Sequence, residues 1–345
     1  MKVPMPTTWS VCVRGFILGM MTWGLAESSA GEPVVVAERF KGNPVVTPAH
    51  SPSLGNNING PSLIRVPDWV EHPLGRYYLY FAHHNGKHIR LAYADSPLGP
   101  WKIHEPGVLP VEGVPALRDH IASPDVHVDE EARQIVIYVH GVDARGGSEQ
   151  VTVRCTSADG LHFTGGETPL GTSYFRVFRH DGYWYALANT GRFYRATDPA
   201  EPWTQRPERL IPSVVVDDAH GRRENVRMRH AAILHRGDHL LVFYTRKDDA
   251  PERILCARVD LKGDWTQWAP SEPIEVLRPE YPYEGVNRPI RVSEMGAAEG
   301  PVHEVRDPCI FVEGDKVLLY YSVAGESGLA AATLLFPTAT GSPVD

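Results

Sequence analysis

The sequence predicts an all-β fold, a five-bladed β-propeller, on three observations. The 345-residue chain contains 31 glycines and 30 prolines, which supply the many turns that such a fold needs, and helical patterns are nearly absent. Short apolar and aromatic runs of strand length alternate with these turns. A unit of three or four such runs occurs five times, about 50 to 75 residues apart. Because each unit can cover its apolar faces only against its neighbours, we expect the units to close into a ring.

The first unit, residues 59–101, shows the pattern most fully. Its second run reads YYLYFA at residues 77–82, and it lies between apolar runs at residues 62–66 and 89–94. The turn SPLGPW, which ends at Trp101, reverses the chain into a fourth short strand. Three or four antiparallel strands in about forty residues make one propeller blade.

Four further units repeat this order, and their turns carry Trp or Phe at Phe163, Trp203 and Trp265. Their strands are predicted at residues 124–127, 134–139 and 151–155; at 174–178, 183–187 and 192–196; at 230–234, 240–244 and 254–259; and at 307–312, 317–321 and 329–335. The fifth unit lacks an outer strand. Residues 34–36 or 44–46, which precede the first unit, are candidates to supply it and so to close the ring.

The first thirty residues are expected to be a secretory signal peptide. Basic residues precede an apolar run from Phe16 to Leu25, and the small residues SSA end at Ala30. The apolar run is too short for a spanning helix. The sequence therefore predicts an exported protein, secreted or periplasmic, in which residues 31–345 form a single propeller domain.

Composition and motifs exclude several classes of partner and site. The formal net charge of −8 argues against nucleic acid and against an anionic membrane surface as partners. No later apolar stretch approaches the length of a membrane span. The sequence holds no phosphate-binding glycine loop, no HExxH or CxxC metal spacing and no GxSxG nucleophile turn.

Three cysteines remain after the signal peptide, and each lies in an apolar run of a different unit: Cys155, Cys256 and Cys309. An odd number without paired spacing predicts no disulfide framework. We therefore expect buried thiols that pack as small apolar side chains.

Propeller geometry predicts which scattered residues meet on one face. The inner strands all begin on the same face, and the loop between the second and third strands returns to it. The residues gathered there are rich in ionisable side chains, whereas the opposite face receives turns typical of solvated hairpins. From the strand starts come Asn59, Asp125, Arg176, His230 and Asp307; from the loops come His83, His84, His140, Asn189, Arg246 and Glu326, with His120 and Arg306 close by.

Several of these residues also have a purely structural interpretation. Asp125 follows Ser-Pro and could cap a turn, and Asp307 could belong to an internal ion pair. Glu326 lies in AGESG, whose glycines suit either a close approach to a ligand or an exposed hairpin tip. His230 begins a core strand and could be a buried histidine with its own partners.

His83 and His84 are interpreted as sugar contacts rather than as metal ligands. Adjacent residues on a strand point to opposite faces, so these two imidazoles would not converge on one ion. With no other ligand spacing in the chain, the sequence predicts no metal ligands.

Three stretches carry a family resemblance. The turn ADSPLGPW ending at Trp101, SPDV at residues 123–126 and SADGLHF at residues 157–163 resemble the five-bladed propeller glycoside hydrolases. These are the arabinanase and β-xylosidase clan with its algal-polysaccharide-cleaving relatives, families 43 and 117. The resemblance covers essentially all of residues 31–345. It implies a secreted glycoside hydrolase that acts on a plant, algal or microbial polysaccharide or its oligosaccharides.

The motifs of that family transfer only in part. The family places an Asp base on blade one, an orienting Asp on blade two and a Glu acid on blade three. In this sequence only Asp125 matches, at the blade-two position. Blade one has Asn59 in NGP and blade three has Arg176 in YFR, neither of which is a carboxylate. The triplet RDP around Asp307 resembles one in fructan-cleaving relatives, but it lies in the fifth unit.

The resemblance implies a set of roles. Hydrolysis needs an acid for the leaving oxygen and a carboxylate that activates water or attacks the anomeric carbon. The expected catalytic carboxylates are Asp125, Asp307 and Glu326, with His230 as an acid near neutral pH. The expected substrate-binding residues are Asn59, His83, His84, His120, His140, Arg176, Arg246 and Arg306. No cofactor is expected to be required, but some relatives hold an ion in the central channel, which leaves open a divalent ion such as calcium.

Two alternatives remain on the same fold. In one, hydrolysis has been lost and the face is a carbohydrate-binding platform, with Tyr174, Phe175 and Trp184 either stacking on sugar rings or packing in the core. In the other, the protein is a lyase-type enzyme that uses His230 and Tyr174 as proton-transfer groups. The number of converging ionisable residues favours an enzyme, and the expected partner is a carbohydrate in all three cases.

Overall fold

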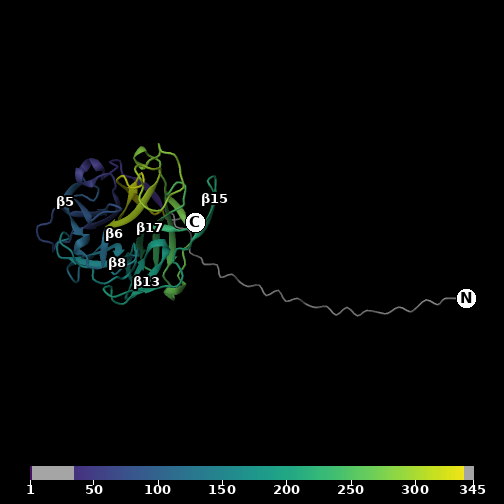
Figure 1. Cartoon of the computed structure of the whole chain (residues 1–345), viewed down its shortest axis with the longest axis horizontal. Coiled ribbons are helices and arrows are strands. Elements are labelled where there is room, and N and C mark those ends of the chain that lie inside the picture. The colour runs from purple at the N-terminus through teal and green to yellow at the C-terminus, as the bar shows by residue number, and fades with distance from the viewer. Residues whose placement is uncertain (2–34, 338–345) are drawn as a thin grey trace, which may run out of the picture.

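The computed structural model describes residues 35–337, and the predicted signal peptide at residues 1–30 lies outside them. Within the described residues, five sheets form the blades of a propeller, accompanied by a separate two-stranded hairpin (Figure 1). The predicted all-β, five-bladed fold is confirmed. No helix among residues 35–337 is both long and apolar enough to cross a membrane.

The blades follow one another along the chain, and each pairs its strands in order. Blade I contains β2 (Asn59–Arg65), β3 (Tyr77–Ala82), β4 (His88–Ala94) and β5 (Lys102–Pro110). Blade II contains β6 (Leu117–Asp129), β7 (Gln134–Asp143), β8 (Gln150–Ser157) and β10 (Gly171–Thr172), with β9 (Thr164–Gly165) also paired to β8. Blade III contains β11 (Arg176–His180), β12 (Tyr183–Leu187), β13 (Phe193–Ala196) and β14 (Thr204–Gln205).

Blades IV and V complete the ring. Blade IV contains β17 (Met228–Arg236), β18 (His239–Arg246), β19 (Ile254–Asp260) and β20 (Ile274–Leu277); blade V contains β21 (Val305–Glu313), β22 (Lys316–Val323), β23 (Leu329–Leu335) and β1 (Val36–Arg39). The hairpin of β15 (Val214–Asp218) and β16 (Gly221–Val226) links blades III and IV and stands out from the ring in Figure 1. Six short 3-10 helices lie in connections: Pro48–His50, Pro52–Leu54, Val111–Gly113, Asn189–Gly191, Trp265–Gln267 and Pro282–Glu284.

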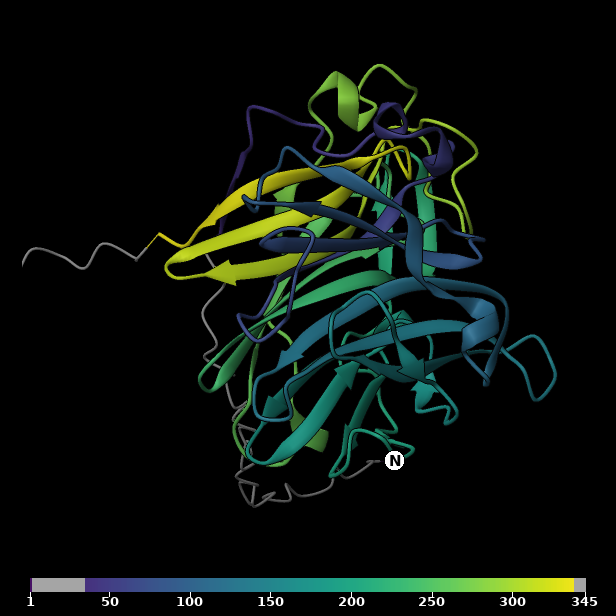
Figure 2. The same cartoon turned by 90° about the vertical axis from the view of Figure 1, so that its left-hand side faces the viewer.

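The two ends of the described chain close the ring. β1 pairs antiparallel with β23, from Val36 opposite Leu335 to Arg39 opposite Ala332, so the earliest strand is the outer strand of the last blade. Figure 2 shows the purple N-terminal part beside the yellow C-terminal strands. The predicted closure by the segment before the first unit is confirmed, with the strand beginning at Val36.

The apolar core is divided among the five contacts between neighbouring blades. Strand β3 serves two of them, because its side chains alternate between its faces. Tyr78 and Tyr80 pack against blade II, whereas Leu79 and Phe81 pack against blade V. As predicted, three free thiols are buried in these clusters: Cys155, Cys256 and Cys309.

Candidate active site

The starts of the inner strands and the adjoining loops form one pocket at the centre of the ring. All five blades contribute to it, and most of its side chains are polar or ionisable. It is lined by Asn59, His84, His120, Ala122, Ser123, His140, Gln150, Tyr174, His230, Asp307 and Glu326. Seven of these are residues that the sequence predicted for the site: Asn59, His84, His120, His140, His230, Asp307 and Glu326. The structure brings them together, and their individual roles stay predictions.

A repeated backbone irregularity places several of these residues. In four blades, the pairing between the first and second strands shifts register at an equivalent position. The shifts follow Asn59, Ala122, Met228 and Arg306. After three of these shifts, φ is positive, at 60° for Gly60, 49° for Ser123 and 48° for Asp307. Tyr174, just before the inner strand of blade III, has a φ of 68°. Non-glycine residues adopt this conformation at a cost in energy, and such residues cluster at functional sites.

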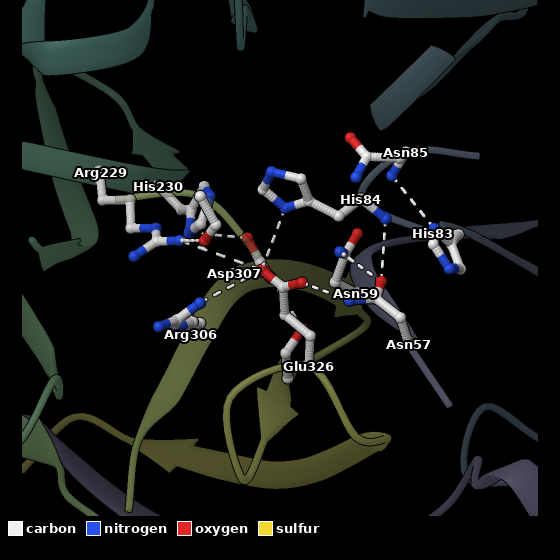
Figure 3. Close-up of polar contacts among 12 residues, drawn as sticks. Asn57, Asn59, His83, His84, Asn85, Arg229, His230, Arg306, Asp307 and Glu326 are labelled. Atoms are coloured by element: carbon white, nitrogen blue, oxygen red, sulfur yellow. Dashed lines mark hydrogen bonds and ion pairs between the residues drawn. The ribbon is translucent and has the colours of Figure 1, made fainter. Parts of the chain in front are cut away.

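Asp307 and His230 form a buried carboxylate–imidazole pair. Oδ1 of Asp307 lies 2.7 Å from Nδ1 of His230 (Figure 3). Oδ2 accepts a hydrogen bond of 2.9 Å from the hydroxyl of Ser322. Burial works to raise the pKa of Asp307, but the adjacent His230 and the charge of Arg229 outweigh it and hold that pKa below its usual range. Asp307 is therefore an ionised group inside the pocket wall.

Tyr174 stands on the other side of the His230 ring. Its hydroxyl lies 3.4 Å from Nε2 of His230. Burial, followed by the negative charge of Asp307, raises the pKa of Tyr174 to about 12. Tyr174 therefore remains a neutral phenol at physiological pH and can donate a hydrogen bond.

Glu326 and His84 form a second carboxylate–imidazole pair. Nδ1 of His84 lies 3.2 Å from Oε1 of Glu326, and the amide of Asn57 donates a hydrogen bond of 2.5 Å to Oε2. The side chain of Asn57 also accepts bonds from the backbone N–H of His84, at 2.9 Å, and from Asn59, at 3.1 Å. Although burial opposes ionisation, the bond from His84 lowers the pKa of Glu326.

A network of buried ion pairs holds Glu326. Arg306, whose side chain is 3% exposed, contacts Oε1 of Glu326 at 3.2 Å and Oε2 of Glu252 at 3.1 Å, and it also pairs with Glu304. Arg229 lies 3.3 Å from the same Glu252 oxygen and donates to the backbone carbonyl of Glu294. These contacts join Glu326 of blade V to Arg229 and Glu252 of blade IV.

His140 lines the same pocket and packs against Tyr174 and His120. Its ring lies against Tyr174, with 4.2 Å between ring centroids, and it is 1% exposed. Burial, followed by the charges of His120 and Arg176, lowers the pKa of His140 well below its usual value. The pKa of the neighbouring His120 is lowered as well, mainly by burial.

Comparison with known proteins identifies a relative along nearly the whole chain. The uncharacterized protein R118 of Acanthamoeba polyphaga mimivirus is 32% identical over 357 residues, which cover 94% of this chain and 98% of R118. This chain belongs to the R118 family. No known family model matches its sequence.

Solved structures share the fold of this R118-family chain. A family-43 enzyme of Xanthomonas citri, determined with xylose, covers 81% of this chain and 87% of its own, with a TM-score of 0.52 and 15% identity. An α-L-arabinofuranosidase of Lactobacillus brevis covers 84% and 92%, with a TM-score of 0.56 and 16% identity. A β-xylosidase/α-arabinofuranosidase from a compost metagenome covers 87% and 94%, with a TM-score of 0.55 and 14% identity. At these identities the likeness shows the five-bladed propeller fold alone.

Asp125 does not line the pocket of this R118-family chain, and the expectation that it would is wrong. It lines a separate cavity further along the inner strands, together with His127 and Arg176. Its Oδ2 accepts bonds of 2.8 Å from His127 and from the backbone N–H of Val177. Burial opposes ionisation, but His127 lowers the pKa of Asp125 overall. The register shift before Asp125 turns Ser123, and not Asp125, toward the pocket.

Four predicted substrate-binding residues also lie outside the pocket lining. Arg176 is buried and binds backbone carbonyls, including that of Ala231 at 2.8 Å, so it joins neighbouring blades. Arg246 contacts Tyr244 at 3.2 Å. Arg306 lies in the ion pairs described above and lines a different cavity. The His83 ring accepts a hydrogen bond of 3.1 Å from the backbone N–H of Asn85. Figure 3 shows the imidazole of His84 turned toward Glu326 and that of His83 turned away. The two residues lie in the turn between β3 and β4, and not on a strand as the prediction assumed.

Sequence reasoning missed Ser123, Gln150 and Asn57, and it named Tyr174 only as a possible proton-transfer or stacking residue. A signal for Ser123 was present. Ser-Pro at residues 123–124 repeats the Gly-Pro at residues 60–61 and the Asp-Pro at residues 307–308, and all three pairs sit at the register shifts. The other residues have no comparable local signature.

A divalent ion in the central channel stays a prediction. Among residues 35–337, no group of three or more His, Cys, Asp or Glu side chains is placed to hold a metal. Calcium takes six to eight oxygen ligands, and the pocket lining offers the carboxylates of Asp307 and Glu326 and the amide oxygens of Asn59 and Gln150. We derive no chemical step through a metal.

Mild acid is expected to destabilise the fold before the carboxylates titrate. Burial lowers the pKa of His140, and also those of His120, His83 and His88, below the value of about 6.5 of an exposed histidine. As the pH falls through about 6.5, the unfolded chain therefore binds protons before the folded chain does, and the free energy of unfolding falls. Urea denaturation at about pH 7.5 and about pH 5.5 measures the difference in the free energy of unfolding. Each unit by which folding lowers the pKa of a histidine is worth about 1.4 kcal/mol. A His140→Gln variant should show a smaller difference, and greater stability at the lower pH would contradict the argument.

Proposed function

We propose that this chain is a glycoside hydrolase whose reaction takes place in the central pocket. The observation that carries the proposal is the pair of Asp307 and His230, an ionised carboxylate 2.7 Å from an imidazole, at the centre of the ring. The fold supports it, since the solved structures that share this propeller are glycosidases. The Xanthomonas citri enzyme was determined with xylose, so a carbohydrate is the proposed substrate here.

In this proposal His230 activates water. Asp307 lies 2.7 Å from Nδ1 of His230, so its negative charge stabilises the imidazolium that forms when Nε2 takes a proton from water. The water oxygen bonds to the anomeric carbon as the bond from that carbon to the leaving oxygen breaks. The leaving oxygen takes up a proton from solvent, and His230 then returns to solvent the proton that it took from water. Activating water reverses the role that the sequence suggested for His230, because a histidine backed by a carboxylate is better suited to accept a proton than to lose one.

Neutral polar groups of the pocket are proposed to hold the sugar. The amides of Asn59 and Gln150 and the hydroxyls of Ser123 and Tyr174 line the same space. Each can donate and accept hydrogen bonds to sugar hydroxyls. Tyr174, kept neutral by its raised pKa, offers its proton without carrying charge.

Sugar release from a panel of neutral, uronic and sulfated glycans tests the proposal. Wild type is compared with Asp307→Asn and with Asp315→Asn, which changes an exposed aspartate in the turn between the same two strands of blade V. We expect release by wild type and by Asp315→Asn, and at least a hundredfold slower release by Asp307→Asn. No release from any glycan by wild type, or equal release by all three proteins, would overturn the proposal.

A lyase-type elimination is the second candidate, and the contact of 3.4 Å between Tyr174 and His230 favours it. In that reaction His230 would remove the proton beside an acidic sugar group and neutral Tyr174 would protonate the leaving oxygen. The same panel distinguishes the two, because elimination leaves an unsaturated sugar with ultraviolet absorbance and hydrolysis does not.

A further inference from the structure

We infer that three arginines beside the pocket, Arg192, Arg209 and Arg227, form a subsite for an oxyanion of the substrate, a carboxylate or a sulfate carried by a sugar. The inference rests on the proposed hydrolase function and names its substrate class, an acidic glycan. It concerns residues that have no part in the reaction proposed above.

Arg192 and Arg209 lie close together because both bind Thr190. Nη1 of Arg192 donates a hydrogen bond of 2.9 Å to Oγ1 of Thr190. Nη1 of Arg209 donates to the same oxygen and also, at 2.7 Å, to the backbone carbonyl of Thr190. Two guanidinium groups therefore share one neutral hydroxyl oxygen, and each keeps most of its five N–H donors for another partner.

The hairpin of β15 and β16 brings Arg227 to the other two. Arg209 precedes the hairpin and Arg227 directly follows it, and Val214 pairs with Val226 at its base (Figure 1). Burial, followed by the charges of Arg192 and Arg227, lowers the pKa of Arg209. The three positive charges are therefore near enough to repel one another.

No aspartate or glutamate among residues 35–337 forms an ion pair with any of these three arginines, although all three are half-buried. The side chain of Arg227 forms no hydrogen bond within that part of the chain, and its Nε is buried. By contrast, Arg223 in the same hairpin pairs with Asp218 at 2.6 Å. Like charges that are partly withdrawn from water are costly unless an anion neutralises them, so the cluster is suited to bind one.

The backbone of Thr190 points to the same conclusion. Its φ is 60°, in the left-handed region, which a β-branched residue adopts only at a cost in energy. Strained residues of this kind cluster at ligand sites. Here the strained residue is the one that holds two of the three arginines.

The cluster adjoins the pocket from two blades. In blade III, the first backbone N–H of the 3-10 helix Asn189–Gly191 donates a bond of 2.9 Å to the carbonyl of Ser173, the residue before Tyr174 of the pocket lining. In blade IV, Arg227 stands three residues before His230, which is at most about 11 Å along the chain. An oligosaccharide with one sugar at His230 would therefore bring the acidic group of a neighbouring sugar to the arginines.

The chemistry of the guanidinium group selects for an oxyanion. It stays charged at every physiological pH, and its planar fork donates two parallel hydrogen bonds to a carboxylate or a sulfate. A neutral sugar hydroxyl gains no such charge-assisted bond. The pocket and the cluster therefore divide the work, with neutral amides and hydroxyls for one sugar and three positive charges for the acidic group of the next.

Binding and turnover of matched glycans test the inference. The probes are oligosaccharides of galacturonic acid and of sulfated galactose, each beside the same oligosaccharide with its carboxylates reduced or its sulfates removed. In isothermal titration calorimetry, we expect wild type to bind the acidic member of at least one pair at least tenfold more tightly than the neutral member. Its kcat/KM should follow the same order, and the preferred series identifies the oxyanion.

Arg227→Gln is the decisive variant, because a side chain without bonds in the described chain can be replaced with little effect on folding, which the melting temperature checks. We expect at least tenfold lower affinity for the acidic oligosaccharide, with a matching rise in KM, and less than a twofold change for its neutral counterpart. Arg227→Lys keeps the charge without the fork and should recover part of the loss. The matched control is Arg76→Gln, which removes an exposed arginine at the end of β3 away from the pocket and should behave as wild type.

The outcomes separate the subsite from the hydrolase function. Equal affinity of wild type for the acidic and neutral members of both series would overturn the subsite, as would a preference that Arg227→Gln leaves unchanged. An equal loss on both members would make Arg227 a structural residue and also overturn it. Arg227-dependent binding of an acidic glycan without sugar release from any glycan would support the subsite and overturn the hydrolase function instead.

Discussion

Replacing Arg306 by methionine is expected to lower the free energy of unfolding by about 3 to 5 kcal/mol. Arg306 is buried and neutralises three carboxylates, those of Glu252, Glu304 and Glu326. Methionine fills a similar volume but leaves these groups without their shared cation. Burial already raises the pKa of Glu304 despite the presence of Arg306. The loss of Arg306 would therefore force at least one of the three carboxylates to take up a proton or to bind water.

Equilibrium denaturation in urea, followed by tryptophan fluorescence, measures this effect. The matched control is Arg222→Met, which removes an arginine from an ion pair with Glu224 whose side chains are 60% and 64% exposed. That change is expected to lower the free energy of unfolding by less than about 1 kcal/mol. If Arg306→Met were as stable as the control, the three buried carboxylates would not depend on Arg306.

Replacing His230 by glutamine is expected to lower kcat by about 10²- to 10⁴-fold on any glycan that wild type cleaves. The side chain is similar in length and polarity, but it cannot accept the proton of water. Because Asp307 acts through His230, the double variant His230→Gln/Asp307→Asn should be about as slow as His230→Gln alone.

Initial rates at saturating substrate, with the melting temperature of each variant as a check on folding, test this second expectation. KM should change little, because neutral amides and hydroxyls hold the sugar in the proposed site. Multiplicative losses in the double variant would mean that Asp307 and His230 act independently, which would contradict their assignment as a pair.

Local patterns predicted the fold because they are the physical cause of it. In YYLYFA at residues 77–82, apolar residues at both alternating positions indicate a strand covered on both faces, and Tyr78 and Phe81 do pack against different blades. The absence of an outer strand in the last unit indicated that the earliest segment would close the ring, which β1 does. Seven predicted residues meet in the pocket because the strand starts, and the loops that return to the same face, converge in any radial array.

Local patterns failed at the site where the strands are irregular. Side chains alternate with a period of two, so one extra residue changes which of them faces the pocket. The shift at residues 123–124 turned Ser123 inward and left Asp125 in another cavity. A pattern that assumes regular strands cannot place such a shift.

The sequence by itself therefore determined the number of blades, the closure of the ring and the face on which polar residues gather, since turn chemistry and alternation of apolar residues act over a few positions. Tertiary structure alone decided which of the charged groups hold the pocket together and which face into it. Arg306 and Asp307 are adjacent in the chain, yet one pairs with Glu252 outside the pocket lining and the other contacts His230 within it. Glu252 and His230 both belong to blade IV, and only the packing of blade IV against blade V brings them within contact distance of these two residues.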